Sequence, residues 1–351
     1  MTGPRFTPGR ALVVLTALGA LTAAAFLVAV SFGEQPVSLA RAVAGQGSDA
    51  VIFWSLRLPR ASLAAIVGAA LAVSGCALQA LLRNPLADPF VLGVSGGAAL
   101  GATTALALGL GTLGAASTAP WLAGLGRISG PSAFALVGAV GATGLVFTLG
   151  RAAGKSSPHA TLLSGVIFNA FALAAITFLK TLASPDKLGE ILYWLAGALG
   201  YERGWTLVGA ALFQVAAIGA MWALSGKLNL LSLGDDEAAA LGVAVERTRL
   251  ALLLLASFSV AAAVALSGLV GFVGLIVPHV LRLWLGPDQR LLVPASALGG
   301  AAFLLLSDLA ARLLFNVFHA EPPVGAITAV LGGPFFLLLL YRREHQAHPF
   351  A

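Results

Sequence analysis

Long apolar stretches separated by short polar breaks make up most of this chain. Runs that contain no Asp, Glu, Lys or Arg and have bilayer-spanning length occur at residues 11–33, 61–82, 128–150, 156–179, 204–226 and 322–341. Each is close to the roughly 20 residues that a membrane-spanning helix needs. We therefore interpret each run as one transmembrane helix.

Two further apolar stretches are too long to be single helices. Residues 89–126 are predicted to end in a Gly/Pro-rich loop around Pro120. Residues 250–285 would form a helix about 54 Å long at 1.5 Å per residue, whereas the hydrocarbon core is about 30 Å thick. We predict two spans there, joined by a tight turn near Ser267 and Gly268. With 291–315 as another span, the chain is predicted to be an all-α membrane protein of about ten helices.

The composition agrees with this interpretation. Of the 351 residues, 59% are hydrophobic and 10% are charged, and the mean hydropathy is +0.95, whereas soluble domains carry roughly a quarter charged residues. The chain has 20 Lys/Arg and 14 Asp/Glu. Its basic residues do not form a run of the kind that binds nucleic acid. We expect no nucleic-acid partner. The single cysteine, Cys76, excludes an internal disulfide.

The distribution of basic residues predicts the orientation. An even number of spans puts both termini on the same side, and cytoplasmic loops carry an excess of Lys and Arg. With cytoplasmic termini, twelve of the twenty basic residues lie inside: Arg5, Arg10, Arg83, Arg151, Lys155, Lys227, Arg247, Arg249, Arg282, Arg290, Arg342 and Arg343. The start, MTGPRFTPGR before an apolar run, is also compatible with a signal peptide. We favour an uncleaved first helix and cytoplasmic termini.

A polar break follows the span at 61–82. It reads Arg83-Asn84-Pro85-Leu86-Ala87-Asp88-Pro89, and its prolines end the helix and restrict the residues before them. Within a bilayer, such a break must face water or a protein-lined cavity, because hydrocarbon offers no hydrogen-bond partner. The alternative is a proline turn that only joins two helices.

The longest predicted inner loop runs from Lys227 to Arg249. Its acidic run, Asp235-Asp236-Glu237, suits a helix N-terminus, and Gly242 after Leu241 suits a helix end. We predict two short helices joined at Gly242, forming a compact knob below the membrane. The alternative is an amphipathic inner loop without a partner.

A second proline-containing segment, GLVGFVGLIVPHVLRL, runs from Gly268 to Leu283. His279, next to Pro278, raises the alternatives of a proton relay or a metal ligand. No other His, Asp or Glu lies nearby in sequence to complete such a site, so we favour a structural role.

The stretch from Gly150 to Ser156 resembles a phosphate-binding loop but has three residues between its glycines, whereas that motif needs four. We therefore expect no nucleotide-binding site in this chain. We expect no catalytic residues, metal or cofactor in this chain.

A loose internal repeat accompanies these motifs. VALSG before Gly268 is similar to LAVSG before Cys76, and Gly299-Gly300-Ala301-Ala302 is similar to Gly96-Gly97-Ala98-Ala99. The matched spans run in opposite directions, as an inverted repeat requires. The alternative is chance similarity in an Ala/Gly-rich sequence.

The motifs at 56–101, 233–249 and 268–334, the last including Glu321-Pro322-Pro323 and Gly332-Gly333-Pro334, resemble the FecCD-type permease family. These permeases belong to ATP-driven importers of iron-siderophore complexes, haem and cobalamin. The resemblance implies one permease domain over residues 1–351 with a coupling loop at about 227–249. It also implies a homodimer in the bacterial inner membrane, two cytoplasmic ABC ATPase subunits and a periplasmic substrate-binding protein.

The resemblance also assigns roles to residues. Arg57, Arg60 and Arg312, on the outer side, would pair with acids of the binding protein; the alternatives are snorkelling to headgroups and, for Arg312, an i,i+4 pair with Asp308. The other implied positions fall into three groups: the cytoplasmic gate (Asn84, Leu86, Ser157 and His159), the ATPase coupling residues (Asp235, Glu237, Ala240, Leu241 and Gly242) and the structural signature (Pro85, Pro278 and His279).

The cargo is ranked by how often each occurs in the family: ferric siderophore first, then cobalamin, then haem. One rival function is an ion-coupled secondary transporter, which usually needs ionisable groups at mid-membrane. The acids of this chain lie in loops or near helix ends, with Asp308 the one ambiguous case. A signalling or assembly protein is a third possibility that the coupling loop does not favour.

Overall fold

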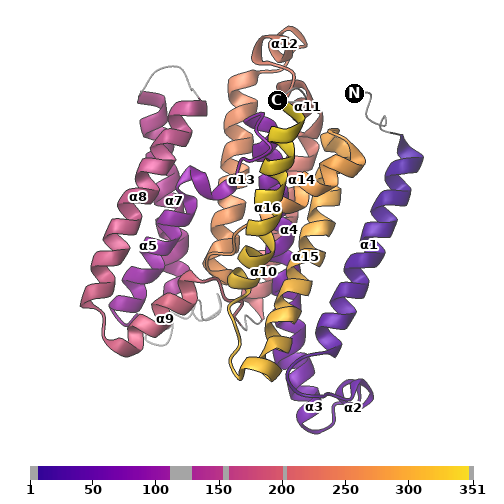
Figure 1. Cartoon of the computed structure of the whole chain (residues 1–351), viewed down its shortest axis with the longest axis vertical. Helices are drawn as coiled ribbons and strands as arrows, with labels where there is room; N and C mark the ends of the chain where they lie inside the picture. Colours follow the sequence, from indigo (N-terminus) through magenta and orange to yellow (C-terminus); the bar gives the residue numbers. More distant parts are fainter. Residues whose placement is uncertain (1–6, 111–128, 153–157, 201–203, 348–351) are drawn as a thin grey trace.

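The structure is a computed structural model that describes residues 7–110, 129–152, 158–200 and 204–347. In these ranges every regular element is a helix (Figure 1). The elements, in chain order, are α1 (Pro8–Ser31), α2 (Leu39–Val43), α3 (Gly47–Val51), η1 (Ile52–Arg57), α4 (Leu58–Leu81), η2 (Pro89–Leu92), α5 (Val94–Ala107), α7 (Gly130–Ala152), α8 (Pro158–Leu182), α9 (Pro185–Leu195), α10 (Trp205–Ala223), α11 (Ser225–Leu231), α12 (Asp235–Ala240), α13 (Val245–Ser267), α14 (Val273–Leu285), α15 (Gln289–Phe318) and α16 (Val324–Ala347).

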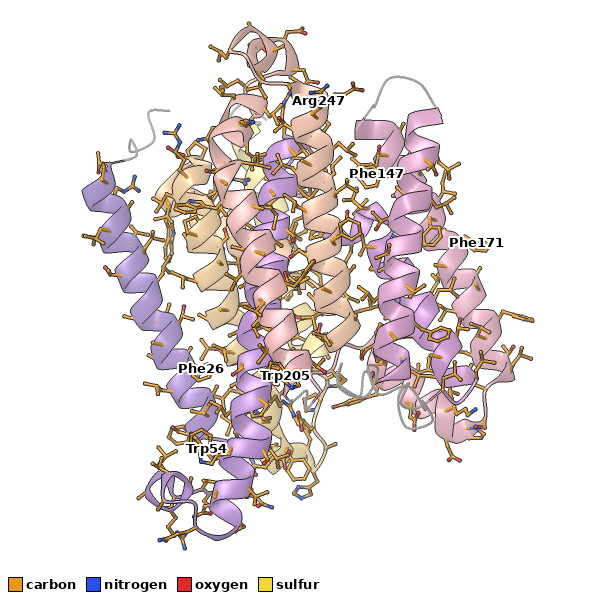
Figure 2. All side chains as sticks on the ribbon, turned by 180° about the vertical axis from the view of Figure 1, so that it is seen from behind. Phe26, Trp54, Phe147, Phe171, Trp205 and Arg247 are labelled. Carbon is orange, nitrogen blue, oxygen red and sulfur yellow. The ribbon has the colours of Figure 1, made fainter. Side chains whose placement is uncertain are left out.

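Ten of these elements suit a membrane. Seven described helices are long and apolar enough to cross it, and three shorter apolar helices accompany them, within α5, α14 and α16. This agrees with the predicted all-α fold of about ten spans. Large apolar side chains face outward around the bundle: Phe171 is 63% exposed and points away from it (Figure 2). Lipid tails would cover such an apolar surface, whereas its exposure to water would be unfavourable.

The two ends of the bundle differ. α1 begins and α16 ends at the end where α12 lies, whereas α2 and α3 lie at the opposite end (Figure 1). Arg247 lies near the α12 end and Trp54 at the other (Figure 2). We call the α12 end the inner end and the α2/α3 end the outer end, after the sides that the charge distribution predicts.

Helix α4 is the centre of the bundle. It packs against α13, α14 and α15. Of the residues in its most apolar stretch, 78% are buried inside the protein. The approach to α15 is close because a Cβ on Gly68 would overlap the backbone carbonyl of Gly300. Small residues at such contacts let membrane helices associate by van der Waals packing. Because α4 reaches both ends, groups at either end are tied to one rigid element.

The predicted break of the stretch 250–285 is confirmed. α13 ends at Ser267, Gly268 adopts φ +63°, and α14 begins only at Val273. α14 has 13 residues, or about 20 Å at 1.5 Å per residue. It is therefore shorter than the predicted span, because the segment between Gly268 and Val273 is not helical.

Helix α9 has no counterpart in the sequence analysis. α9 (Pro185–Leu195) follows α8 at the outer end and packs against α5. Lys187 Nζ donates to the Ala107 carbonyl, 2.9 Å away, at the end of α5. The lysine thereby satisfies a carbonyl that has no partner within its own helix.

Candidate functional site

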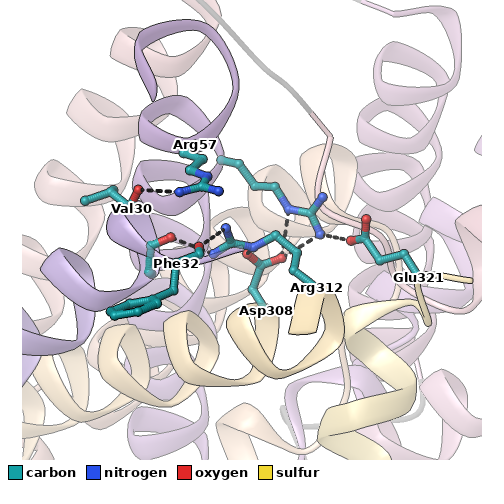
Figure 3. A network of polar contacts seen from close by, with 8 residues as sticks. Val30, Phe32, Arg57, Asp308, Arg312 and Glu321 are labelled. Atoms are coloured by element: carbon teal, nitrogen blue, oxygen red, sulfur yellow. Dashed lines mark hydrogen bonds and ion pairs between the residues drawn. The ribbon is translucent and has the colours of Figure 1, made fainter. Parts of the chain in front are cut away.

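The outer ends of α4 and α15 are joined by a buried ion cluster. Asp308 accepts from Arg60 Nε at 2.9 Å and from Arg312 Nε at 3.0 Å. Arg60 also pairs with Glu321, in the loop between α15 and α16 (Figure 3). Asp308 is 1% exposed, Arg60 5% and Arg312 6%. Such burial is tolerable only because each charge has partners.

The same cluster caps helix α1. Arg312 donates to the Ala29 carbonyl at 2.8 Å and to Phe32 at 3.1 Å. Arg57 donates to Ser31 at 2.6 Å and also to Gln35. The last carbonyls of a helix have no partner within it and carry partial negative charge, so guanidinium groups suit them.

The three arginines predicted to dock the binding protein therefore lie together, but they are buried. They reach the outside through a pocket of about 160 Å³. Its lining comprises Gly33, Glu34, Gln35, Ile52, Leu56, Arg57, Arg60 and Arg312. The i,i+4 pair of Arg312 with Asp308, the sequence-based alternative, is present. Arg57, by contrast, forms no ion pair with any described carboxylate.

At the inner end, the polar break is a set of helix caps. α4 ends in a Schellman motif, in which Arg83 N donates to Ala80 and Asn84 N to Gln79. Arg83 takes the left-handed position, with φ +50°. The Asn84 side chain then accepts from Leu86 N at 3.0 Å.

The predicted gate residues are described only in part. Asn84 is exposed, while Leu86 and Pro85 are half-buried. Ser157 lies outside the described residues. His159 lies in the first turn of α8, and its side chain is outside the described part as well.

Asn169 of α8 supports the segment after this break. Its Nδ2 donates to the Phe90 carbonyl at 3.0 Å, and its Oδ1 accepts from Gly96 N at 3.2 Å. The sequence analysis missed Asn169 because a single Asn in an apolar run does not reveal which distant backbone groups it satisfies.

Pro278 breaks the hydrogen-bond ladder of α14, and a side chain of α4 compensates. Gln79 Nε2 donates to the carbonyls of Gly274 and Leu275 at 3.2 and 3.1 Å. Pro278 has no N–H to donate to the Gly274 carbonyl, so Gln79 supplies the donor that the helix lacks there. His279 is half-buried. Gln79, which the sequence analysis did not single out, is thus the residue that accommodates the proline.

The coupling loop forms the predicted knob, with one correction. α12 begins at the acidic run as predicted, but the other short helix of the knob, α11, comes before it, so the two meet around Leu233 and Gly234 and not at Gly242. Gly242 (φ +84°) instead ends α12 in a second Schellman motif, with its N–H donating to Ala239. The helix that follows Gly242 is the long α13 and not a second short helix, because the span that starts at Val245 continues without a break to Ser267.

Most of the predicted coupling residues lie on the surface of this knob. Glu237, Ala240, Leu241 and Gly242 are exposed, and Leu241 is 61% exposed although it is apolar. Its neighbours Ala240 and Gly242 are small, so the tip of the knob is open to approach from outside.

Asp235 differs from its neighbours because it forms ion pairs. Its carboxylate is 2.7 Å from Arg249 Nη2 and 2.5 Å from Arg83 Nη2. The hydrogen bond from Arg249, with the charges of both arginines, lowers the pKa of Asp235 from its usual value although partial burial opposes this. The knob is therefore joined by charge to the ends of α4 and α13.

Among the described residues, no three His, Cys, Asp or Glu side chains gather as metal ligands. What the geometry provides is two charged clusters at opposite ends of one central helix. Such an arrangement is suited to binding other proteins and to movement.

Comparison with known proteins agrees with this picture. The model of the FecCD transport family matches residues 21–342. The hemin transport system permease protein HmuU of Yersinia pestis is 43% identical over 297 residues, which is 84% of each chain. The cobalamin import system permease protein BtuC of Halobacterium salinarum is 44% identical over 299 residues, or 85% of this chain and 75% of that protein.

A solved structure has the same fold. It is described as an inward-facing ABC transporter of metal-chelate type, with a TM-score of 0.78 and 32% identity, covering 94% of this chain and 99% of that one. The family match and these similarities extend over nearly all of the chain. It is therefore a multi-pass membrane permease that belongs to the FecCD transport family.

Proposed function

We propose that this chain is the permease subunit of an ATP-binding-cassette importer that moves a metal chelate or tetrapyrrole-type cargo inward by alternating access. Residues 1–351 act as one permease domain. The observation that carries the proposal is the compact knob of α11 and α12, joined by ion pairs to the helix break that follows α4. Family membership and the haem and cobalamin permeases among its relatives support it.

The cargo we propose is haem or cobalamin, with a ferric siderophore as the alternative in the same transport class. Relatives named for haem and cobalamin are 43% and 44% identical to this chain. This favours a tetrapyrrole-type ring over the ferric siderophore, which ranks first by its frequency in the family. All three cargoes are large and offer apolar surface, which suits a wide, mostly apolar path.

The proposed assembly is a homodimer with the path between its two copies. Two cytoplasmic ABC ATPase subunits bind below and one periplasmic binding protein docks above. The chain lies in the bacterial inner membrane with both termini in the cytoplasm. Hydrolysis of ATP belongs to the ATPase subunits, because the only stretch of this chain that resembles a phosphate-binding loop has the wrong spacing.

Within this assembly, the exposed tip of the knob, comprising Glu237, Ala240, Leu241 and Gly242, seats on the ATPase subunit. Asn84 and Leu86, with Ser157 and His159, narrow the inner end of the path. Closure of the ATPase pair moves the knob, and the knob moves the break that contains the gate.

The binding protein docks at the outer pocket. An acidic side chain entering the pocket lined by Arg57, Arg60 and Arg312 meets the guanidinium of Arg57, which no described carboxylate pairs with, and this favours rapid and oriented association. Arg57 is the first contact because Arg60 and Arg312 already pair with Asp308. Those two arginines shape the pocket and add to its field.

The rival function, ion-coupled transport, has one acid in its favour. Asp308 is buried, as an ion-relay carboxylate would be, but two arginines already pair with it. Each of its two carboxylate oxygens therefore already accepts a hydrogen bond from a guanidinium group.

Uptake into proteoliposomes tests the proposal. The complex of this chain with its ATPase and binding protein is reconstituted, and labelled haem, cobalamin and a ferric siderophore are offered in competition. We expect one tetrapyrrole to accumulate with ATP and not with a non-hydrolysable analogue. Uptake that follows a proton or sodium gradient without ATP would contradict the proposal.

A further inference from the structure

The knob and the inner gate are in contact through the side chain of Arg83. Arg83 Nε donates to the Leu231 carbonyl, 3.1 Å away, at the end of α11. Its Nη2 lies 2.5 Å from Asp235 Oδ1, at the start of α12. The next residue along the chain, Asn84, begins the break that holds the proposed gate. One side chain therefore spans the short distance between two segments that the proposed function requires to move together.

The backbone conformation of Arg83 is unfavourable for a residue with a side chain. The residue occupies the left-handed position of a Schellman motif, with φ +50°. Glycine is usual there because it has no Cβ to clash. An arginine at this position gains nothing for the turn itself, so the value of the residue lies in the contacts that its guanidinium makes.

Asp235 is held from the other side as well. Both of its carboxylate oxygens lie 2.7 Å from Arg249 Nη2, near the start of α13. Arg249 is buried, at 8% exposure, so it provides a firm anchor. One carboxylate thus joins the end of α4, the start of α12 and the start of α13.

The neighbouring acids do not share this arrangement. Asp236 and Glu237 are exposed and form no ion pair with any described residue. The three consecutive acids carry the same charge, but only Asp235 forms ion pairs with described residues. Asp236 is therefore a matched control for Asp235.

We propose that Arg83 and Asp235 are positioning residues that transmit movement of the coupling knob to the inner gate at Asn84 and Leu86. The inference rests on the proposed function. An exposed ion pair adds little to folding stability, and the side chains of Arg83 and Asp235 are 44% and 46% exposed. Its contribution is to keep two moving segments in register.

The test measures cargo transported per ATP hydrolysed by the intact complex in proteoliposomes, for Asp235→Asn, Arg83→Gln and the double variant. Each single variant should lower this ratio roughly fivefold or more, the range of typical coupling energies. ATP hydrolysis and co-purification of the ATPase should stay within about twofold, as for other surface substitutions. The double variant should be no worse than the singles, because both remove the same contact.

Two controls separate this inference from the alternatives. Asp236→Asn should leave the ratio unchanged, and an equal fall in that variant would overturn the link. Arg83→Gly suits the left-handed backbone and removes only the side chain, so it should fold normally and still lose coupling. An unchanged ratio in Arg83→Gly or Asp235→Asn would contradict the proposal. If the unmutated complex shows no ATP-driven uptake, the proposed function itself fails and this inference falls with it.

Discussion

The two ends of α4 carry ion clusters of opposite construction. At the outer end, the side chains of Arg60, Asp308 and Arg312 are 6%, 1% and 7% exposed. At the inner end, the side chains of Arg83 and Asp235 are 44% and 46% exposed. The same residue types, at the two ends of the same helix, are enclosed by protein in one case and exposed to solvent in the other.

Burial decides what each cluster can do. Removing one partner from a buried cluster leaves an uncompensated charge and is strongly destabilising. Exposed pairs are screened by salt and contribute little to stability, so they can break and re-form during a cycle. We infer that the outer cluster holds α1, α4 and α15 together, whereas the inner one transmits movement.

The largest expected effect comes from the same substitution at the two ends. Asp308→Ala leaves two buried guanidinium groups without their shared carboxylate and should cost about 3–5 kcal/mol of stability. Asp235→Ala should cost clearly less, because the Asp235 side chain is 46% exposed and water can take its place beside Arg83 and Arg249. Thermal unfolding of the purified permease checks both. Equal shifts in the unfolding midpoint would remove the distinction between the two clusters.

Next in size is the effect of Arg57 on docking. Arg57→Gln should weaken capture of the binding protein by roughly tenfold, or about 1.4 kcal/mol, because it removes the cation that no described carboxylate neutralises. Arg41→Gln is the control, since Arg41 is also on the outer side and its side chain is 67% exposed. Binding measured at low and high salt should show a smaller salt dependence for Arg57→Gln alone. Unaltered affinity in that variant would exclude Arg57 from the interface.

A smaller stability effect is expected at Gly242, with a disproportionate effect on function. No atom lies within 4 Å of a Cβ added there, so alanine and tryptophan should each cost only the roughly 1 kcal/mol of a left-handed backbone. Tryptophan should nevertheless uncouple ATP hydrolysis from uptake, because its bulk projects toward the ATPase subunit. Unfolding and uptake are compared for the two variants. Normal transport by Gly242→Trp would contradict the proposed seating.

The smallest expected effect is a pH dependence at the outer pocket. Partial burial, and then the neighbouring Glu321 carboxyl, raise the pKa of Glu34 above its usual value. Its negative charge is therefore present at high pH and is lost as pH falls through the raised pKa, which makes the pocket more positive. Glu34→Gln should bind the binding protein more tightly than the unmutated chain at pH 8, and this advantage should shrink as pH falls. A constant ratio of affinities across pH would contradict this.

The spans and their breaks could be predicted from the sequence because the cause is local. Pro85, Pro89 and Gly268 interrupt apolar runs, and a helix in lipid ends where its backbone can no longer be satisfied. The end of α12 at Gly242 was also predicted from a local signal, because a glycine after Leu241 suits the left-handed position at a helix end. α9 was missed because it is too short and too polar to be identified by a search for spans.

The pairing of charges could not be predicted in the same way. Arg60 meets Asp308 and Glu321, which are 248 and 261 positions away in the chain, and Gln79 meets carbonyls 195 positions away or more. Only the pair of Arg312 with Asp308, four residues apart, was accessible as a local alternative. The sequence indicated which arginines are unusual, and tertiary packing determined their partners.

The most direct test of the account is a distance measurement on the proposed complex of two copies of this chain with the ATPase subunits. Cys76 is fully buried, so a single spin label can be placed on an introduced cysteine, at Ala239 on the knob or at Leu82 beside the gate. Each label reports the separation between the two copies. The account predicts that ATP shifts both distances in the unmutated complex, and that Asp235→Asn keeps the shift at the knob and loses the shift at the gate. A gate that still moves with ATP in Asp235→Asn would contradict it.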